Sequence, residues 1–350
     1  MTHASKEHLA ENASAKGSTR VVNVCEQELP AAIARLIGAE GLDGSAVERF
    51  LGAASAHGIN LDHVWASYGR GGGVHEVAMA VPAAGRAAML FTSTPQSKAR
   101  ENELADVIRS VTCSLGNLGK VEQDSVTDGR SQRGAGGDGG SGRGDVVLMQ
   151  ALLKPEEESV RRALEQAGWL VVGDLDYMRR AISASDARLG DDSKDLDTGI
   201  SIRRYTSGDD GVFIEALEAS YVDTLDCPEL CGMRPTADVL EGHRATGHFD
   251  PDLWWLVEHD HQPAGVMLLN PNPEQSAVEL VYIGLAPSVR GRGLAKHLLT
   301  MGLATLAGRI EREVTCAVDV RNTPALRLYE RLGFRAFARR TALVLPIAHE

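Results

Sequence analysis

Apolar and polar positions follow two different periods along the second half of the chain. Residues 200–206 alternate every second residue, as a half-buried strand does, and residues 277–287 form an apolar run interrupted by Glu279. Residues 291–308 instead repeat apolar side chains at helical spacing. The full pattern predicts the order β-α-α-β-β-β-α-β-α-β, with elements at residues 200–206, 211–225, 236–247, 252–260, 262–270, 277–287, 291–308, 313–320, 323–333 and 334–347. This order is typical of a mixed α/β sheet with helices on its faces.

The first half repeats this order more faintly. In both halves a helix ends at a glycine followed by an aromatic residue, Gly168-Trp169 and Gly333-Phe334, and a strand follows. The predicted elements of the first half lie at residues 28–41, 45–58, 62–69, 75–83, 86–95, 101–115, 145–155, 156–169 and 170–181. We therefore predict an internal duplication, and an α/β protein of two similar domains, each a mostly antiparallel twisted sheet flanked by helices.

Polar segments set the expected domain boundaries. Residues 1–18 form a polar tail that we expect to be disordered, and a glycine-rich stretch at about 125–145 has a composition that cannot pack a core. An acidic stretch at 186–199 is the expected linker. The first domain then spans 19–185 and the second spans 200–350.

Composition narrows the class of protein. The 350 residues carry a formal net charge of -12, which argues against a nucleic-acid partner bound through a basic surface. Five scattered cysteines do not form a disulfide framework. No stretch has the apolar length of a membrane span, and the first twenty residues lack the apolar core of a secretory signal. We expect a cytoplasmic protein with no membrane partner.

The segment PSVRGRGLAKHLL, residues 287–299, predicts an anion site. It joins a strand to an amphipathic helix whose first N–H groups have no partner, and Gly291 and Gly293 allow an anion to approach them. Arg290 and Arg292 add positive charge. A dinucleotide fingerprint would need a third glycine where Lys296 stands, and the Gly-Lys-Ser/Thr of a P-loop is absent. The pattern fits a pyrophosphate.

Arg290-x-x-Gly293-x-Ala295 resembles motif A of the GCN5-related N-acetyltransferases (GNAT superfamily), and VDVRNTPALRLYERLGF at 318–334 resembles their motif B. The resemblance covers about residues 200–347, and the C-terminal half is most similar to mycothiol synthase-like GNATs. It implies a tandem GNAT arrangement with acetyl-CoA as co-substrate. The residues implied to hold acetyl-CoA are Ile283, Gly284, Leu285, Arg290, Gly291, Arg292, Gly293, Leu294, Ala295 and Asn322. The first half lacks this motif and carries Glu101 and Glu103 at the corresponding turn, so we expect a degenerate GNAT-like domain that has lost CoA binding.

The resemblance also implies two catalytic residues. Glu279 lies eight residues before Pro287, as does a glutamate of the mycothiol synthase-like enzymes, and would be the general base. Tyr329 occupies the motif B position that protonates the departing thiolate. On pattern alone, Glu279 could instead face solvent and Tyr329 could be a buried aromatic anchor. Ala317 stands where those enzymes carry a substrate-binding tyrosine, so their sugar–inositol substrate is not implied.

A zinc site is the alternative interpretation of one segment. Cys227, Cys231, His243 and His248 have nearly the spacing of a Cys2His2 site, but the internal aromatic residue of a zinc finger is missing. We favour no metal and an acceptor-site loop at these cysteines, with Asp226 as a contact for an amine.

These observations predict an N-acetyltransferase that moves the acetyl group of acetyl-CoA to a primary amine of a small molecule by direct attack. A protein or peptide N-acetyltransferase and a non-catalytic acetyl-CoA sensor or scaffold remain as alternatives. The sequence names neither the acceptor amine nor the oligomeric state.

Overall fold

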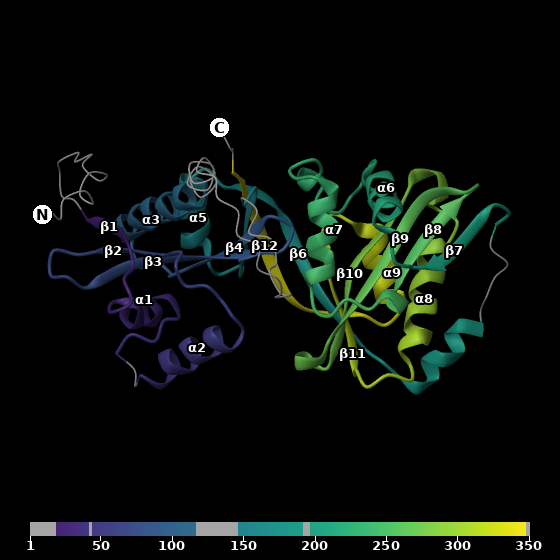
Figure 1. Cartoon of the computed structure of the whole chain (residues 1–350), viewed down its shortest axis with the longest axis horizontal. Coiled ribbons are helices and arrows are strands. Elements are labelled where there is room, and N and C mark those ends of the chain that lie inside the picture. The colour runs from purple at the N-terminus through teal and green to yellow at the C-terminus, as the bar shows by residue number, and fades with distance from the viewer. Residues whose placement is uncertain (1–18, 42–43, 117–145, 192–196, 348–350) are drawn as a thin grey trace, which may run out of the picture.

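The chain folds around one twelve-stranded sheet that runs the length of the molecule (Figure 1). The structure is a computed structural model that describes residues 19–41, 44–116, 146–191 and 197–347. The expected tail at 1–18 and the glycine-rich stretch at 125–145 lie outside the described residues. No helix in the described ranges is both long and apolar enough to cross a membrane.

Each half of the chain contains the same succession of elements, which confirms the predicted mixed α/β fold. The first half contains β1 (Arg20–Asn23), α1 (Leu29–Leu36), α2 (Ser45–Ala56), β2 (Val64–Tyr68), β3 (Val74–Ala83), β4 (Ala87–Thr92), α3 (Lys98–Gly116), β5 (Leu148–Leu153), α5 (Glu158–Gln166) and β6 (Leu170–Ala181). The second half contains β7 (Ile200–Arg204), α6 (Asp210–Tyr221), α7 (Thr236–Ala245), β8 (Trp254–His259), β9 (Gln262–Asn272), β10 (Ala277–Leu285), α8 (Leu294–Leu306), β11 (Glu313–Asp319), α9 (Thr323–Arg331) and β12 (Arg335–Pro346).

The two halves exchange their last strands. The order across the sheet is β1-β2-β3-β4-β5-β12-β6-β11-β10-β9-β8-β7, so β12 pairs with β5 of the first half and β6 pairs with β11 of the second half. From either edge, the first five strands of one half follow in chain order, and the last strand of the other half comes next. Among the described strands, only β4–β5 and β10–β11 pair in parallel. The sequence pattern predicted two sheets, and the structure joins them into one.

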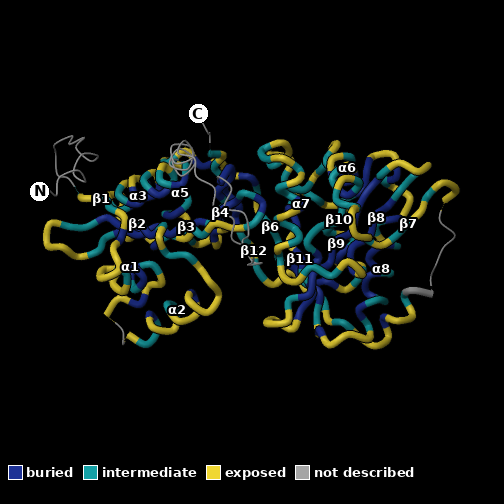
Figure 2. Tube along the Cα trace, viewed as in Figure 1, coloured by how far each residue is buried: buried dark blue, intermediate teal, exposed yellow. Residues whose placement is uncertain are grey.

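Helices cover both faces of the sheet in each half (Figure 2). In the second half, α8 and α9 pack on one face over a core of buried aliphatic side chains. There α6 and α7 pack on the other face, around Phe213, Leu217 and Trp254. In the first half, α3 and α5 cover one face and α1 the other. The strands are therefore buried on both faces near the centre of each half, as their long apolar runs require.

The segment between the halves is partly structured. Residues Ala184–Asp191 form a 3-10 helix that packs against α8, where the sequence pattern led us to expect an acidic linker from residue 186. Arg180 of β6 holds this helix through a two-bonded ion pair with Asp186 at 2.6 and 2.8 Å. The halves also touch at the β3–β4 turn, where Arg234 donates to the Gly85 carbonyl at 2.9 Å.

The strand exchange predicts that a first-half residue stabilises the second-half core. Met178 of β6 is 2% exposed and lies in the core under α8. Met178→Ala should lower the free energy of unfolding by about 2–5 kcal/mol, because it leaves a cavity in that core. Leu170→Ala, at a 52% exposed position of the same strand, should change it by less than about 0.5 kcal/mol. Chemical denaturation of both variants measures the difference, and equal losses would contradict the exchange.

Candidate active site

The site begins where two parallel strands separate. β10 and β11 pair only at three positions, the last of which joins Glu279 to Thr315. Beyond this point β10 continues along β9 alone, and β11 continues along β6 alone. A bulge between Leu280 and Tyr282 accompanies the separation. The backbone of residues 280–285 therefore has no strand partner on its β11 side, and it opens onto a gap in the sheet.

A cavity of about 940 Å³ occupies this gap and continues between α8 and α9. It brings together most of the residues expected at the site. The expected residues among its lining are Asp226, Ile283, Gly284, Leu285, Arg290, Gly291, Gly293, Leu294, Ala295, Asn322 and Tyr329. Glu279 and Arg292 are not among the lining residues.

The N-terminus of α8 forms the outer end of the cavity. Gly293 precedes the helix with φ +81°, no side chain caps the first turn, and a Cβ at Gly293 would meet no atom within 4 Å. The N–H groups of Leu294, Ala295 and Lys296 thus precede the first N–H that can bond within the helix, that of His297 to the Gly293 carbonyl. This end of the cavity attracts anions through these donors and the helix dipole.

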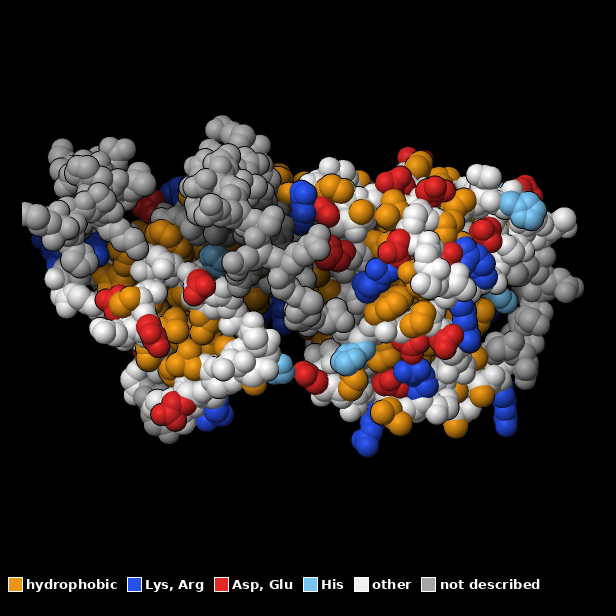
Figure 3. Space-filling model, in the orientation of Figure 1, with side chains coloured by type: hydrophobic (Ala, Val, Ile, Leu, Met, Phe, Trp, Pro, Cys, Tyr) orange, Lys and Arg blue, Asp and Glu red, His pale blue; other side chains and the backbone are white. Residues whose placement is uncertain are grey.

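Basic side chains that line the cavity also favour an anionic ligand. Lys296 follows the glycines, and Arg327 and Arg331 lie four residues apart on α9. On the face shown in Figure 3, acidic and basic side chains are interspersed over the second half, so the basic lining is local. These three side chains were not predicted as site residues from the sequence, although the i, i+4 spacing of the two arginines in motif B was a usable signal.

Arg290 and Arg292, which we expected to contact a phosphate, have other partners in the structure. The Arg290 guanidinium donates to four backbone carbonyls, those of Ser220, Val222, Asp223 and Leu285. Arg290 therefore ties the end of α6 to the turn before α8. Arg292 is exposed and lies 3.5 Å from Asp197.

Three predicted polar residues meet at the inner end of the cavity. Asn322 caps α9 by accepting from the Ala325 N–H at 3.3 Å, and it also lines the cavity. Burial raises the pKa of Tyr329 well above its ordinary value, and Cys316 and Asp226 add to this effect. The phenol therefore stays protonated at neutral pH and can donate a proton. Burial also raises the pKa of Asp226, whose Oδ1 accepts from the Asp319 N–H at 2.9 Å.

Glu279 lies at the point of strand separation, next to Leu280, which lines the cavity. The side chain is half-buried and forms no hydrogen bond or ion pair with any residue in the described ranges. Burial raises its pKa above the ordinary value of a glutamate. A carboxylate with a raised pKa and no protein partner is available to accept a proton.

The loop that carries Asp226 is fixed by an arginine of motif B. Arg321 binds Glu229 at 2.6 and 2.9 Å and Asp319 at 2.6 Å, and it donates to the Val172 carbonyl of β6. The buried Asp319 carboxylate accepts the Cys227 N–H at 3.1 Å. The loop is thus bound to both halves of the chain.

The zinc alternative finds no support in this geometry. No group of three or more His, Cys, Asp or Glu side chains within the described ranges is placed to hold a metal ion. His243 instead stacks on Tyr282, with ring centroids 5.5 Å apart. Burial, followed by the charge of Arg234, lowers the pKa of His243 to about 4, so the ring is neutral at pH 7.

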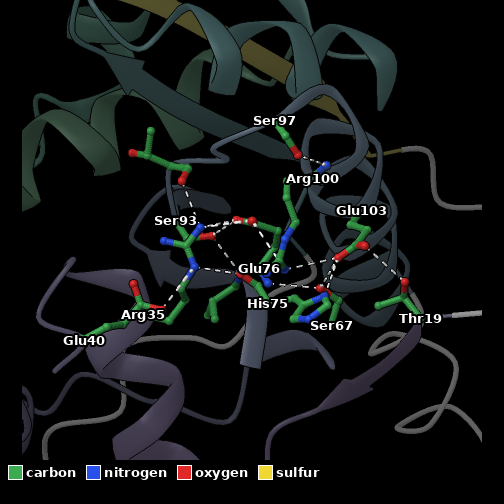
Figure 4. A network of polar contacts seen from close by, with 12 residues as sticks. Thr19, Arg35, Glu40, Ser67, His75, Glu76, Ser93, Ser97, Arg100 and Glu103 are labelled. Carbon is green, nitrogen blue, oxygen red and sulfur yellow. Dashed lines mark hydrogen bonds and ion pairs between the residues drawn. The ribbon is translucent and has the colours of Figure 1, made fainter. Parts of the chain in front are cut away.

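In the first half, charged side chains fill the region that corresponds to the N-terminus of α8. Glu101, in the first turn of α3, binds Arg162 at 2.6 Å and Lys98 at 2.8 Å, and these bonds lower its pKa to about 2. Nearby, buried Glu76 binds Arg35 at 2.8 Å and accepts from Ser93 at 2.6 Å (Figure 4). Carboxylates in these positions repel a phosphate.

The network in Figure 4 continues around a second carboxylate. Glu103 of α3 binds His75 at 3.0 Å and accepts from Thr19 at 3.2 Å. Glu101 and Glu103, which we expected near the turn from the sequence, are therefore both engaged with side chains of the first half.

Comparison with known proteins agrees with this geometry. The acetyltransferase (GNAT) family model matches residues 219–334. Curated relatives named mycothiol acetyltransferase include those of Streptomyces coelicolor, 28% identical over 50% of this chain and 54% of the relative, and of Kineococcus radiotolerans, 35% identical over 48% and 52%. That of Clavibacter sepedonicus is 28% identical over 66% of this chain and 74% of the relative. The chain spans about half the length of the first two.

Two solved structures resemble nearly the whole chain. A GCN5-related N-acetyltransferase from Sphaerobacter thermophilus is 19% identical over 94% of this chain and 95% of its own, with a TM-score of 0.49. A tandem GNAT protein from the clavulanic acid biosynthesis pathway is 12% identical over 95% and 99%, with a TM-score of 0.46. The family match lies within the second half, whose two motifs are on their expected elements, so this half is similar to GNAT acetyltransferase domains. One sheet joins it to a first half that repeats its order of elements.

Proposed function

We propose that this chain is an N-acetyltransferase that moves the acetyl group of acetyl-CoA to a primary amine of a small molecule. One observation carries the proposal: the open N-terminus of α8 leads, through a single cavity between β10 and β11, to the phenol of Tyr329. This arrangement suits a long ligand with an anionic end and a reactive end. The pyrophosphate of CoA would take the N–H groups of residues 291–296, and the pantetheine arm would follow residues 283–285.

The chemistry assigns one proton transfer to each catalytic side chain. The amine nitrogen attacks the thioester carbon, and Glu279 accepts the amine proton through one bound water, since its side chain lies beside the cavity rather than in it. The carbon–sulfur bond breaks, and the phenol of Tyr329 donates its proton to the leaving thiolate. The raised pKa of Glu279 supports its role as the base, and the raised pKa of Tyr329 keeps its phenol protonated until the thiolate forms.

The relatives and one side chain of the cavity indicate the class of acceptor. The curated relatives are named mycothiol acetyltransferases, which favours a small molecule over a protein. Asp226 lines the inner end of the cavity and is placed to contact a cationic amine. In the first half, Glu101 stands where the phosphates of a second CoA would bind, so we propose that this half does not bind CoA.

Gly293→Val tests the proposed pyrophosphate site at the N-terminus of α8. The new side chain would enter the open space at the outer end of the cavity, so acetyl-CoA binding measured by calorimetry should be lost. Because φ at Gly293 is +81°, valine also strains the backbone, and Gly208→Val serves as the matched control. Gly208 has φ +96° and equally open space, but it is not a cavity residue.

The control variant should lose stability to a similar extent and keep its affinity for acetyl-CoA. Unchanged affinity in Gly293→Val would contradict the assignment of this helix end to the phosphates. Equal loss of affinity in both variants would mean that backbone strain, rather than a side chain in the pyrophosphate site, caused the effect.

Glu279→Gln tests the acid–base pair and should lower turnover by about two to four orders of magnitude without changing acetyl-CoA affinity. The wild-type rate should rise with pH through the pKa of Glu279, which lies above its ordinary value, because only the carboxylate accepts a proton. The deficit of the variant should shrink at high pH, where the amine loses its proton unaided. Initial rates of CoA release with a panel of amines give both profiles.

Tyr329→Phe provides the contrasting variant in that experiment. It removes the acid that protonates the thiolate, so high pH should not restore its rate. Near-normal turnover in both variants, with an amine that the wild type acetylates, would show that the enzyme uses other groups. Absence of CoA release with every amine would support a sensor or scaffold.

A further inference from the structure

The exchanged strand places a tyrosine of the first half beside the inner end of the cavity. Tyr177 of β6 lies directly opposite Ala317 of β11 in the sheet register. Ala317 lines the cavity and is exposed. Without the exchange, a residue of the first half would not lie next to β11.

The side chain of Tyr177 points to the face where the acceptor loop lies. Met178 and its partner Cys316 belong to the core under α8, so Tyr177 and Ala317 point to the opposite face. Two residues earlier on β6, Leu175 packs against the same small core as Cys227, which follows Asp226 in the loop. The methyl group of Ala317 leaves room beside the phenol.

The phenol of Tyr177 is half-buried and forms no hydrogen bond with any residue in the described ranges. Its ring is held edge-on to Phe337, with centroids 6.4 Å apart. Burial raises the pKa of Tyr177, the charge of Glu279 raises it further and that of Arg340 lowers it. Arg340 is itself half-buried and has no ion pair among the described residues. A protonated phenol with no partner at this position is available to a ligand.

We propose that Tyr177 is an acceptor-binding, specificity-determining residue that donates a hydrogen bond to an oxygen of the acceptor while the amine lies at Glu279. The proposal rests on the proposed function and adds the acceptor's chemical class. The acceptor is an amine that also carries a hydroxyl or carboxylate oxygen. The positive charge of Arg340 allows a carboxylate to bind here.

The sheet geometry sets the spacing of the two acceptor groups. Glu279 and Tyr177 lie two strands apart and two residues apart along the sheet. Strand spacing of about 4.8 Å and a rise of about 3.4 Å per residue put their Cα atoms about 12 Å apart. The two side chains bridge most of this distance, so an amine and an oxygen separated by a few bonds fit between them.

The test compares wild type and Tyr177→Phe with three matched series of two to five carbons: alkylamines, terminal amino alcohols and terminal amino acids. The wild type should acetylate at least one oxygen-bearing amine with kcat/KM about tenfold above the alkylamine of equal length, as one hydrogen bond provides. Tyr177→Phe should remove this preference, chiefly through KM, and leave alkylamine turnover and acetyl-CoA affinity unchanged. The oxygen-bearing series with the higher kcat/KM shows whether the acceptor carries a hydroxyl or a carboxylate.

Tyr68→Phe is the control, because Tyr68 is a half-buried tyrosine of the first half whose phenol bonds Glu28 far from the cavity. It should keep the wild-type preference, and melting curves should show Tyr177→Phe folded, since the ring contact with Phe337 remains. Equal use of all three series by the wild type, or a preference that survives in Tyr177→Phe, would overturn the proposal. Acetylation of no amine would instead overturn the proposed function.

Discussion

The separation of β10 from β11 is the constraint on which the site depends. Parallel pairing stops at Glu279 and Thr315, and residues 280–285 then have a strand partner on one side only. Backbone N–H and carbonyl groups that lose their partner inside a protein need another. A ligand that lies in the gap can satisfy them, and the cavity beside these residues is where it would lie. The anion-attracting helix end, the phenol of Tyr329 and the carboxylate of Glu279 all take their positions from this opening.

The exchange of β6 and β12 makes the two halves one structural unit. Each half completes its sheet with the last strand of the other, so neither sheet is complete alone. The exchange also gives the first half a place beside the site. In the first half Glu101 of α3 is bonded to Arg162, and the last strand of this half places Tyr177 opposite Ala317 of the other half. We propose that the first half has in this way lost one binding site and contributes to the remaining one.

Local patterns predicted much of this structure. The period of apolar residues predicted the order of elements in the second half and, apart from β1, in the first half. The glycines at 291 and 293 predicted the open helix end, because these features depend on neighbouring residues. The strand exchange was not predictable in this way, since a strand of either half offers the same pattern to any partner. Arg290 illustrates a second limit. Its position beside the glycines indicated a phosphate contact, but its partners are four backbone carbonyls, one at Leu285 and three at the end of α6 and just after it, about seventy residues earlier in the chain.

A crystal structure with bound CoA would show directly whether the ligand lies in this gap. We expect density for the pyrophosphate at the N–H groups of residues 291–296, with the pantetheine arm between β10 and β11 and its sulfur beside Tyr329. Density for CoA at the first turn of α3, or on the second half outside the gap between these strands, would contradict it.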